Sequence, residues 1–181
     1  LEIPGYQPPI IRYPNKQNWW KTTLAWMSIG YETQIAPINT LAFFNAIANN
    51  GRMVKPRFVK AIMRDGEVIE EFPVEVLKES ICSSSALKKM QDMLEGVVSK
   101  GLGKQAGSKQ FHVSGKTGTA QVAQGAGGYK SGAMQYLVSF CGYFPSENPQ
   151  YSCIVAIRKP GYPASGGGMA GPVFSRIAER V

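Results

Sequence analysis

The sequence predicts an α+β domain, with an antiparallel sheet of at least three strands flanked by helices and a small hairpin as an excursion. Apolar residues recur at helical spacing in two segments of the first hundred residues, and three runs typical of strands follow in the last eighty. Successive antiparallel strands beside helices are typical of this class. The chain has 181 residues, 44% of them hydrophobic, which suffices for one core. Residues 1–181 are therefore expected to belong to one domain, without a second.

The first fifty residues hold an extended lead-in and a helix. Residues 1–20 contain four prolines, which oppose both helices and central strands, so this stretch is expected to be extended. A helix is predicted from Ala36, because Pro37 suits a first helical turn and apolar residues recur at helical spacing as far as Ala48. Asn50–Gly51 then provides a left-handed stop.

A hairpin and a second helix are expected next. Asp65–Gly66 separates the runs 58–64 and 67–72, and Asp-Gly between two such runs indicates a tight hairpin turn. The second helix begins at Ser83–Ser85, where a serine hydroxyl can cap it, and ends at Gly101. Its predicted core stripe consists of Leu87, Met90, Leu94, Val97 and Val98.

The last eighty residues are predicted to be mainly strands. Residues 111–122 form the first strand and are followed by a glycine-rich loop, Gln124–Gly132. Residues 137–144 and 151–158 form an antiparallel hairpin across the turn at 145–149. A second loop, Pro160–Ala170, contains three consecutive glycines. Pro172 then opens a closing helix, whose predicted apolar face consists of Val173, Phe174, Ile177 and Val181.

Composition excludes several classes of function. The net charge of +8 is compatible with an anionic partner, but a solvated basic surface is favoured and no basic run alternates with aromatic residues, so nucleic acid is not expected. The single histidine, His112, and three cysteines without a CxxC pair exclude the common zinc motifs, and no metal is expected. Cys141 and Cys153 lie at similar distances from the hairpin turn. They are expected to be cross-strand neighbours in the core rather than a disulfide.

Four short patterns invite a functional interpretation that their context does not support. Gly166–Gly171 fits the dinucleotide fingerprint but is followed by only ten residues, and Gly115–Thr117 resembles the end of a phosphate-binding loop but lies within a predicted strand. Ser85–Lys88 fits SxxK, and Ser146–Asn148 fits SxN. We interpret the first as a helix N-cap and the second as a hairpin turn.

One run within the first predicted strand contains residue types that suit the binding of a ligand. A cation and two hydroxyls flank a glycine in the run Lys116, Thr117, Gly118 and Thr119. A glycine inside a strand suggests that another group approaches the backbone closely. On an edge strand these groups suit the binding of the C-terminal carboxylate of an extended peptide, or of an acyl group. A strand end with ordinary threonine and lysine residues explains the same run equally well.

The run GKTGTAQ, residues 115–121, resembles the third motif of the penicillin-binding proteins, the serine D,D-transpeptidases that crosslink peptidoglycan. The resemblance covers the chain from about Leu24 to its end. The other segments that resemble this family are 27–31, 36–38, 46–56, 94–98, 142–145 and 171–174. Residues 136–145 look more like the division-type class B enzymes than the elongation-type ones.

The order of motifs in this family implies which part of a domain the chain represents. The family places SxxK first, SxN second and KTG third, so Ser85, Lys88, Ser146 and Asn148 do not carry over. The resemblance implies that the chain is the C-terminal half of the transpeptidase domain, with the nucleophilic serine upstream. It also implies that the three strands are neighbours in chain order, with the KTG strand at an edge facing the cleft. The last strand would normally pair with an upstream strand, so the chain alone is expected to self-associate or to be marginally stable.

The resemblance also implies a function and partners. The full-length enzyme would transfer the acyl group of a D-Ala-D-Ala stem peptide without any cofactor, and β-lactams would inhibit it. Lys116 would supply electrostatic stabilisation and proton handling, Thr117 and Thr119 would bind the substrate carboxylate, Gly118 would leave room, and His112 would be structural. The family acts on the periplasmic side of the cytoplasmic membrane, anchored by an N-terminal helix, together with divisome or cell-wall synthesis proteins. A β-lactam sensor and, less favoured, an NTP-binding protein are the alternatives.

Overall fold

The computed structural model describes residues 4–14, 17–124, 128–129 and 134–181. The chain divides into two compact units, Leu1–Thr40 and Leu41–Val181, and the division falls inside the helix α2, Pro37–Ala48. The expectation of a single domain stays a prediction. Most of the predicted glycine-rich loop, Gln124–Gly132, lies outside the described residues. None of the helices in the described part of the chain has the length and apolar character needed to cross a membrane.

In its described residues, the first unit is mostly irregular chain with one short helix besides the first turn of α2. The described part of the lead-in has no helix or strand, as predicted, and its single bridge joins Ile10 to Gln34. The helix α1, Thr23–Ser28, was not predicted; it spans six residues, too few for a periodic apolar signal. The Thr23 side chain is fully buried, and its hydroxyl accepts a hydrogen bond from the Trp20 N–H at 3.0 Å.

The predicted N-terminal helix and its stop are confirmed. The helix α2 begins at Pro37 and ends at Ala48, and Asn50 and Gly51 follow with φ of 52° and 87°. These left-handed conformations end the helix because asparagine and glycine tolerate them best. A short pair of strands that was not predicted, β1 (Met53–Val54) and β4 (Val76–Lys78), follows in the second unit.

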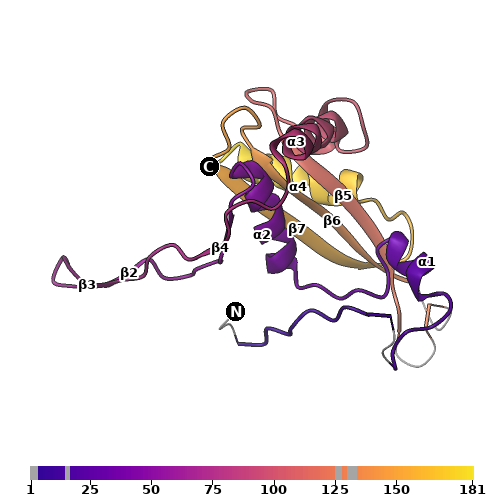
Figure 1. Ribbon diagram of the computed structural model, residues 1–181. Coiled ribbons are helices and arrows are strands. Elements are labelled where there is room, and N and C mark those ends of the chain that lie inside the picture. Colours follow the sequence, from indigo (N-terminus) through magenta and orange to yellow (C-terminus); the bar gives the residue numbers. More distant parts are fainter. Residues whose placement is uncertain (1–3, 15–16, 125–127, 130–133) are drawn as a thin grey trace. The chain divides into compact units, whose positions relative to one another are not determined.

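The predicted hairpin projects from the second unit as a thin two-stranded arm (Figure 1). It consists of β2, Ala61–Arg64, and β3, Glu67–Glu71, paired antiparallel. Asp65 and Gly66 in the turn have φ of 54° and 86°, as a type I′ turn requires. Every residue of β3 is exposed. The hairpin therefore contributes little to the hydrophobic core.

The helix α3, Ser84–Ser99, corrects two details of the prediction. Its N-cap is Ser83, whose hydroxyl accepts a hydrogen bond from the Ala86 N–H, so the interpretation of Ser85 as the cap was wrong. Leu94 in the predicted stripe is buried, whereas Met90 is exposed. Gln91 faces inward instead, and its side-chain amide donates to the Ile47 carbonyl at 3.0 Å.

Replacing Ser83 with alanine is expected to lower the stability of the protein by about 1 kcal/mol, because the Ala86 N–H loses its partner. A thermal melt should then show a midpoint lower by about 3 °C. Ser85→Ala is the matched control, since Ser85 is the second residue of the helix, is exposed and is not the residue that caps it. An equal loss for the two variants would argue against Ser83 as the cap.

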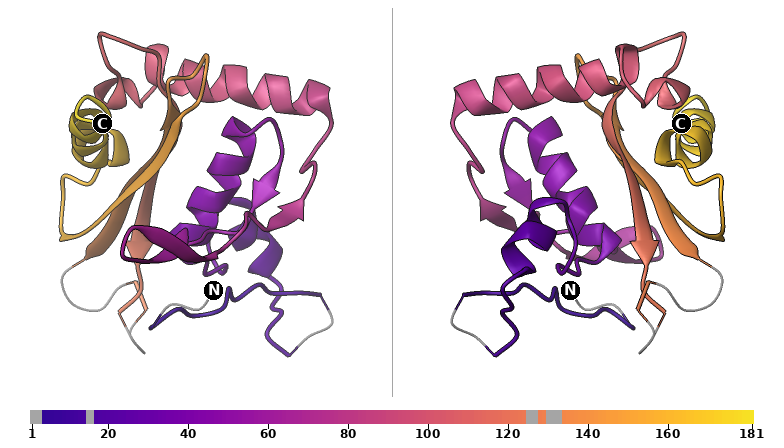
Figure 2. Two further views of the ribbon diagram at one scale, coloured as in Figure 1. Left: turned by 90° about the vertical axis from the view of Figure 1, so that its left-hand side faces the viewer. Right: turned by 90° about the vertical axis from the view of Figure 1, so that its right-hand side faces the viewer.

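The main sheet has three antiparallel strands in the order β5, β6, β7, as predicted. These strands are Ser114–Val122, Gln135–Phe144 and Tyr151–Pro160. The central strand β6 is covered on both faces, since Phe140 contacts Phe174 of the helix α4 (Gly171–Ala178) while Tyr143 packs with Leu94 of α3. Figure 2 shows α4 beside one face of the sheet and α3 on the other side.

The segment between the sheet and the closing helix differs from its prediction. The predicted loop Pro160–Ala170 ends in a π-helical turn, η3, Gly166–Ala170. Elsewhere in the chain, after α3, a 3₁₀ turn, η1, spans Lys104–Ala106. The predicted apolar face of α4 was partly wrong. Phe174 is fully buried, but Ile177 and Val181 are exposed, because the inward positions of this short helix are Gly171, Phe174 and Ala178.

The two cysteines of the sheet are staggered rather than directly opposite. Cys141 pairs with Ile154, and Cys153 pairs with Gly142. Residues that are opposite in register share a face and successive residues alternate, so the two sulfur atoms lie on opposite faces of the sheet. Both thiols are free, in agreement with the expectation of core residues without a disulfide.

Alkylation by iodoacetamide at pH 8 should modify Cys82 and spare Cys141. Burial raises the pKa of Cys141 to about 12, so at pH 8 its thiol stays protonated and lacks the nucleophilic thiolate. Cys82 is exposed. Peptide mapping by mass spectrometry measures both sites, and denatured protein is the control in which both should react. Modification of Cys141 at the rate of Cys82 in the native protein would contradict the buried position.

Candidate functional site

The four candidate residues lie on β5, which is an edge strand of the three-stranded sheet, as predicted. Lys116 and Thr119 are exposed, and Thr117 and Gly118 are half-buried. In the antiparallel register, Thr117 pairs with Phe140 and Gly118 pairs with Ser139. The side chains of successive residues of β5 therefore point to opposite faces of the sheet. Because β5 is an edge strand, half of its backbone N–H and C=O groups point away from β6 and can pair with an extended ligand.

The Lys116 ammonium is the charged group of this edge. It donates a hydrogen bond to the carbonyl of Thr117 at 2.9 Å. The ion pairs found among the described residues do not include Lys116. Its positive charge is therefore not neutralised by a carboxylate of the described chain, and it can interact with an anion that reaches the strand.

Gly118 lies close to the neighbouring strand β6 and to the turn η3. A Cβ atom at this position would lie 2.5 Å from the Ser139 hydroxyl oxygen on the neighbouring strand. The backbone of Gly118 is also approached closely by the chain itself, since a Cβ on Gly166 of η3 would lie 2.4 Å from the Gly118 carbonyl oxygen. The sequence suggested that something approaches this backbone, and η3 does so.

Thr119 is joined to η3 by its side chain. The Gly166 N–H donates a hydrogen bond to the Thr119 hydroxyl oxygen at 3.0 Å. A hydroxyl has one hydrogen and two lone pairs, so this bond leaves the hydrogen available to a ligand. This contact was missed by the sequence analysis, because its two partners are 47 residues apart and the triple glycine was read as a loop.

The SxxK look-alike lacks the properties of a catalytic pair. The Lys88 ammonium lies 2.9 Å from the Asp92 carboxylate, and the hydrogen bond and charge of Asp92 raise its pKa above the ordinary lysine value. A lysine with a raised pKa remains protonated at neutral pH and cannot accept a proton from the Ser85 hydroxyl. The structure thus gives Lys88 a surface ion-pair partner, and the exclusion of Ser85 and Lys88 from the site stays a prediction.

The SxN look-alike lies in the β6–β7 connection and has a structural role. The Ser146 hydroxyl is 2.8 Å from the buried Ser114 hydroxyl, and the Ser146 N–H donates to the His112 carbonyl at 2.9 Å. These bonds tie the connection to the start of β5. The GKT triplet lies inside β5 rather than in a loop opening a helix, which is the wrong context for a phosphate-binding loop.

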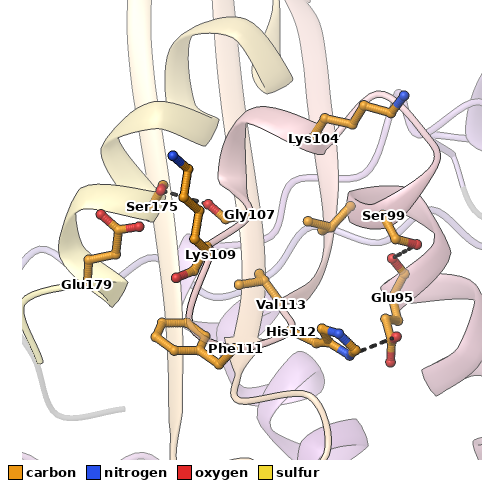
Figure 3. Close-up of a pocket in the computed structure, with 12 residues that line it drawn as sticks. Glu95, Ser99, Lys104, Gly107, Lys109, Phe111, His112, Val113, Ser175 and Glu179 are labelled. Carbon is orange, nitrogen blue, oxygen red and sulfur yellow. Dashed lines mark hydrogen bonds and ion pairs between the residues drawn. The ribbon is translucent and has the colours of Figure 1, made fainter.

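A separate pocket of about 790 Å³ lies near the ends of α3 and α4 (Figure 3). At its wall, the Nδ1 atom of His112 lies 3.3 Å from the Oε1 atom of Glu95. The Ser175 hydroxyl donates to the Gly107 carbonyl at 2.8 Å, and the Ser99 hydroxyl donates to the Glu95 carbonyl at 3.0 Å. Both of these hydroxyl hydrogens are used within the fold, so neither Ser175 nor Ser99 is arranged as a nucleophile. None of residues 116–119 lines it.

Comparison with known proteins identifies the family. The family model described as "Penicillin binding protein transpeptidase domain" matches residues 9–179. The penicillin-binding protein PbpB of Mycobacterium tuberculosis is 30% identical over 188 residues, covering 98% of this chain and 26% of that protein. The peptidoglycan D,D-transpeptidase FtsI homolog of Mesostigma viride is 30% identical over 165 residues, covering 84% of this chain and 27% of that protein.

Solved structures agree with this result. The structure of penicillin-binding protein 3 from Mycobacterium tuberculosis, complexed with aztreonam, has a TM-score of 0.80 and 28% identity, covering 98% of this chain and 41% of that one. A putative peptidoglycan glycosyltransferase from Atopobium parvulum has a TM-score of 0.75 and 30% identity, with coverages of 98% and 39%. The chain spans about a quarter of the length of the curated relatives named above. The match of nearly the whole chain shows that it belongs to the penicillin-binding protein transpeptidase domain family.

Proposed function

We propose that this chain is the C-terminal part of the transpeptidase domain of an enzyme that crosslinks peptidoglycan and is inhibited by β-lactams. Family membership over residues 9–179 supports the reaction class. The observation that carries the proposal for the site is the edge strand β5, whose two exposed residues are Lys116 and Thr119 and whose outer backbone groups point away from β6. The nucleophilic serine and the SxN motif would belong to sequence upstream of this chain.

The proposed reaction is acyl transfer through a covalent intermediate. The serine oxygen attacks the carbonyl carbon between the two terminal D-Ala residues and loses its proton to a base. The C–N bond then breaks, and the departing D-Ala amine takes up a proton. An amine of a second stem peptide attacks the acyl-enzyme, which forms the crosslink and returns the serine to its free state.

Each residue of the KTG run has a role in this proposal. The Thr117 and Thr119 hydroxyls bind the substrate carboxylate, and the Lys116 ammonium supplies positive charge and handles a proton near the SxN serine. The Thr119 backbone N–H forms half of the oxyanion hole, and the N–H of the nucleophile forms the other half. Gly118 leaves room for the close approach of the substrate.

The biological setting is part of the same proposal. Two of the relatives are named FtsI homolog and PbpB, which favours a division-type enzyme. Such an enzyme acts on peptidoglycan stem peptides on the periplasmic side of the cytoplasmic membrane, held by an N-terminal helix outside this chain. Its protein partners would be the divisome or other cell-wall synthesis proteins.

Intact-mass measurement after incubation with a labelled penicillin tests the assignment. The 181-residue chain should gain no mass, because it lacks the attacking serine, whereas the full-length protein should gain one penicilloyl group at an upstream SxxK serine. Ser85→Ala in the full-length protein is the control and should leave acylation unchanged. An adduct mapped to Ser85 would overturn the motif assignment. Acylation without any crosslinked product would instead indicate a β-lactam sensor.

A further inference from the structure

The π-helical turn η3 packs directly against β5, the strand that carries the candidate site residues. A Cβ atom on Gly166 would lie 2.4 Å from the Gly118 carbonyl oxygen, 2.5 Å from the Ser139 carbonyl oxygen and 2.9 Å from the Gly118 nitrogen. All three atoms belong to the backbone and cannot rotate away. Only glycine therefore allows the turn to rest on β5 and β6 at this distance.

The neighbouring residues hold the turn in place from two other sides. A Cβ on Gly167 would lie 2.1 Å from the Leu102 carbonyl oxygen and 3.4 Å from the Thr117 methyl carbon, so this residue fills the space between β5 and the chain after α3. Ser165 caps the turn, because its hydroxyl accepts a hydrogen bond from the Gly168 N–H at 3.0 Å. The Gly166 N–H is thus fixed in position.

This N–H sets the direction of the Thr119 hydroxyl. The bond from Gly166 occupies one lone pair of the Thr119 oxygen at 3.0 Å, so the remaining hydrogen can be offered to a ligand at the exposed edge. A donor held in this way favours a carboxylate, which only accepts hydrogen bonds, and charge makes such a bond about twice as strong as a neutral one.

Resting on the function proposed above, we infer that Gly166 is a positioning residue that orients the Thr119 hydroxyl as a donor. Through it, the η3 turn sets the preference of the site for a substrate with a free carboxylate over a neutral ester. The triple glycine thus forms part of the site, although it lies 47 residues from Thr119 in the chain.

The test compares acylation of the full-length protein by benzylpenicillin and by its methyl ester. The ratio of the two second-order rate constants measures the carboxylate preference. Gly166→Ala should reduce this ratio by about 10-fold or more, the value of one hydrogen bond to a charged group. Thr119→Val should reduce it similarly, and adding Gly166→Ala to Thr119→Val should reduce it no further, because both changes remove the same oriented donor.

A milder variant keeps the test valid if Gly166→Ala does not fold. Ser165 is exposed, so Ser165→Ala preserves the fold but removes the cap of η3, and it should lower the ratio by a smaller factor than Gly166→Ala. Ser99→Ala is the matched control, because Ser99 is also exposed and its hydroxyl also bonds one backbone group, the Glu95 carbonyl on α3. It should leave the ratio unchanged.

Three results separate failure of this inference from failure of the proposed function. If the unmodified protein prefers the acid but the Ser165 and Gly166 variants slow both substrates equally, the turn is merely structural and the inference is overturned. A reduction by Gly166→Ala that persists in the Thr119→Val background overturns it as well. If the unmodified protein reacts with neither compound, or without preference, the proposed function fails together with the inference built on it.

Discussion

Replacing Lys116 with methionine in the full-length protein should slow acylation by penicillin by about 10²–10³-fold, the usual effect of removing one group that stabilises developing charge. Methionine keeps the apolar stem of the side chain and removes the ammonium. The charge at this position is not neutralised by a described carboxylate, so its loss acts directly on an approaching anion. Stopped-flow kinetics with a chromogenic β-lactam gives the rate constant.

The matched control for this prediction is Lys104→Met. Lys104 belongs to η1 and lines the separate pocket, so its substitution changes the net charge of the chain equally without touching β5. The control should acylate at nearly the unmodified rate. If the two variants slow acylation to the same extent, a general loss of positive charge would explain the effect, and Lys116 would lose its proposed role.

The second large effect is expected from Phe174→Ala in α4. The Phe174 ring is fully buried, with ring centroids 4.7 Å from Phe140 and 5.6 Å from Phe144. Its truncation leaves a cavity between helix and sheet, which should lower the free energy of unfolding by about 3–5 kcal/mol. A thermal melt should show a midpoint lower by roughly 10 °C.

Ile177→Ala on the same helix is the control for Phe174→Ala. The Ile177 side chain is 38% exposed, so its truncation removes little buried surface and should cost less than about 1 kcal/mol. The sequence pattern placed both residues on one apolar face, and this pair of variants distinguishes the two positions. Equal losses would mean that Ile177 is covered in solution.

Features with a local cause could be predicted from the sequence. The Asp65–Gly66 turn, the stop at Asn50–Gly51 and the serine cap of α3 depend on backbone conformation within a few residues, which side-chain type largely determines. The order of the three main strands followed from their sequence and the family resemblance. The exact cap residue, Ser83 rather than Ser85, could not be read from three consecutive serines.

Features that depend on tertiary contacts could not be predicted in the same way. The exposure of Met90 and Ile177 depends on which neighbouring element covers each helix face, and periodicity alone does not contain that information. The candidate strand was recognised from its lysine, threonines and glycine, but the Gly166–Thr119 bond joins distant segments. A glycine run that looks like a flexible loop can equally be a turn in which no side chain fits, and only the packing distinguishes the two.

The β2–β3 hairpin offers a place to modify the molecule. Among the described residues, the buried ones that form the hydrophobic core lie outside its strands, Ala61–Arg64 and Glu67–Glu71, so lengthening the turn at Asp65–Gly66 leaves that core unchanged. The entropic cost of a longer loop grows slowly, by about 0.6 kcal/mol for each doubling. An affinity tag or a fluorescent reporter inserted there would extend from the domain while leaving the strand that carries Lys116 and Thr119 intact.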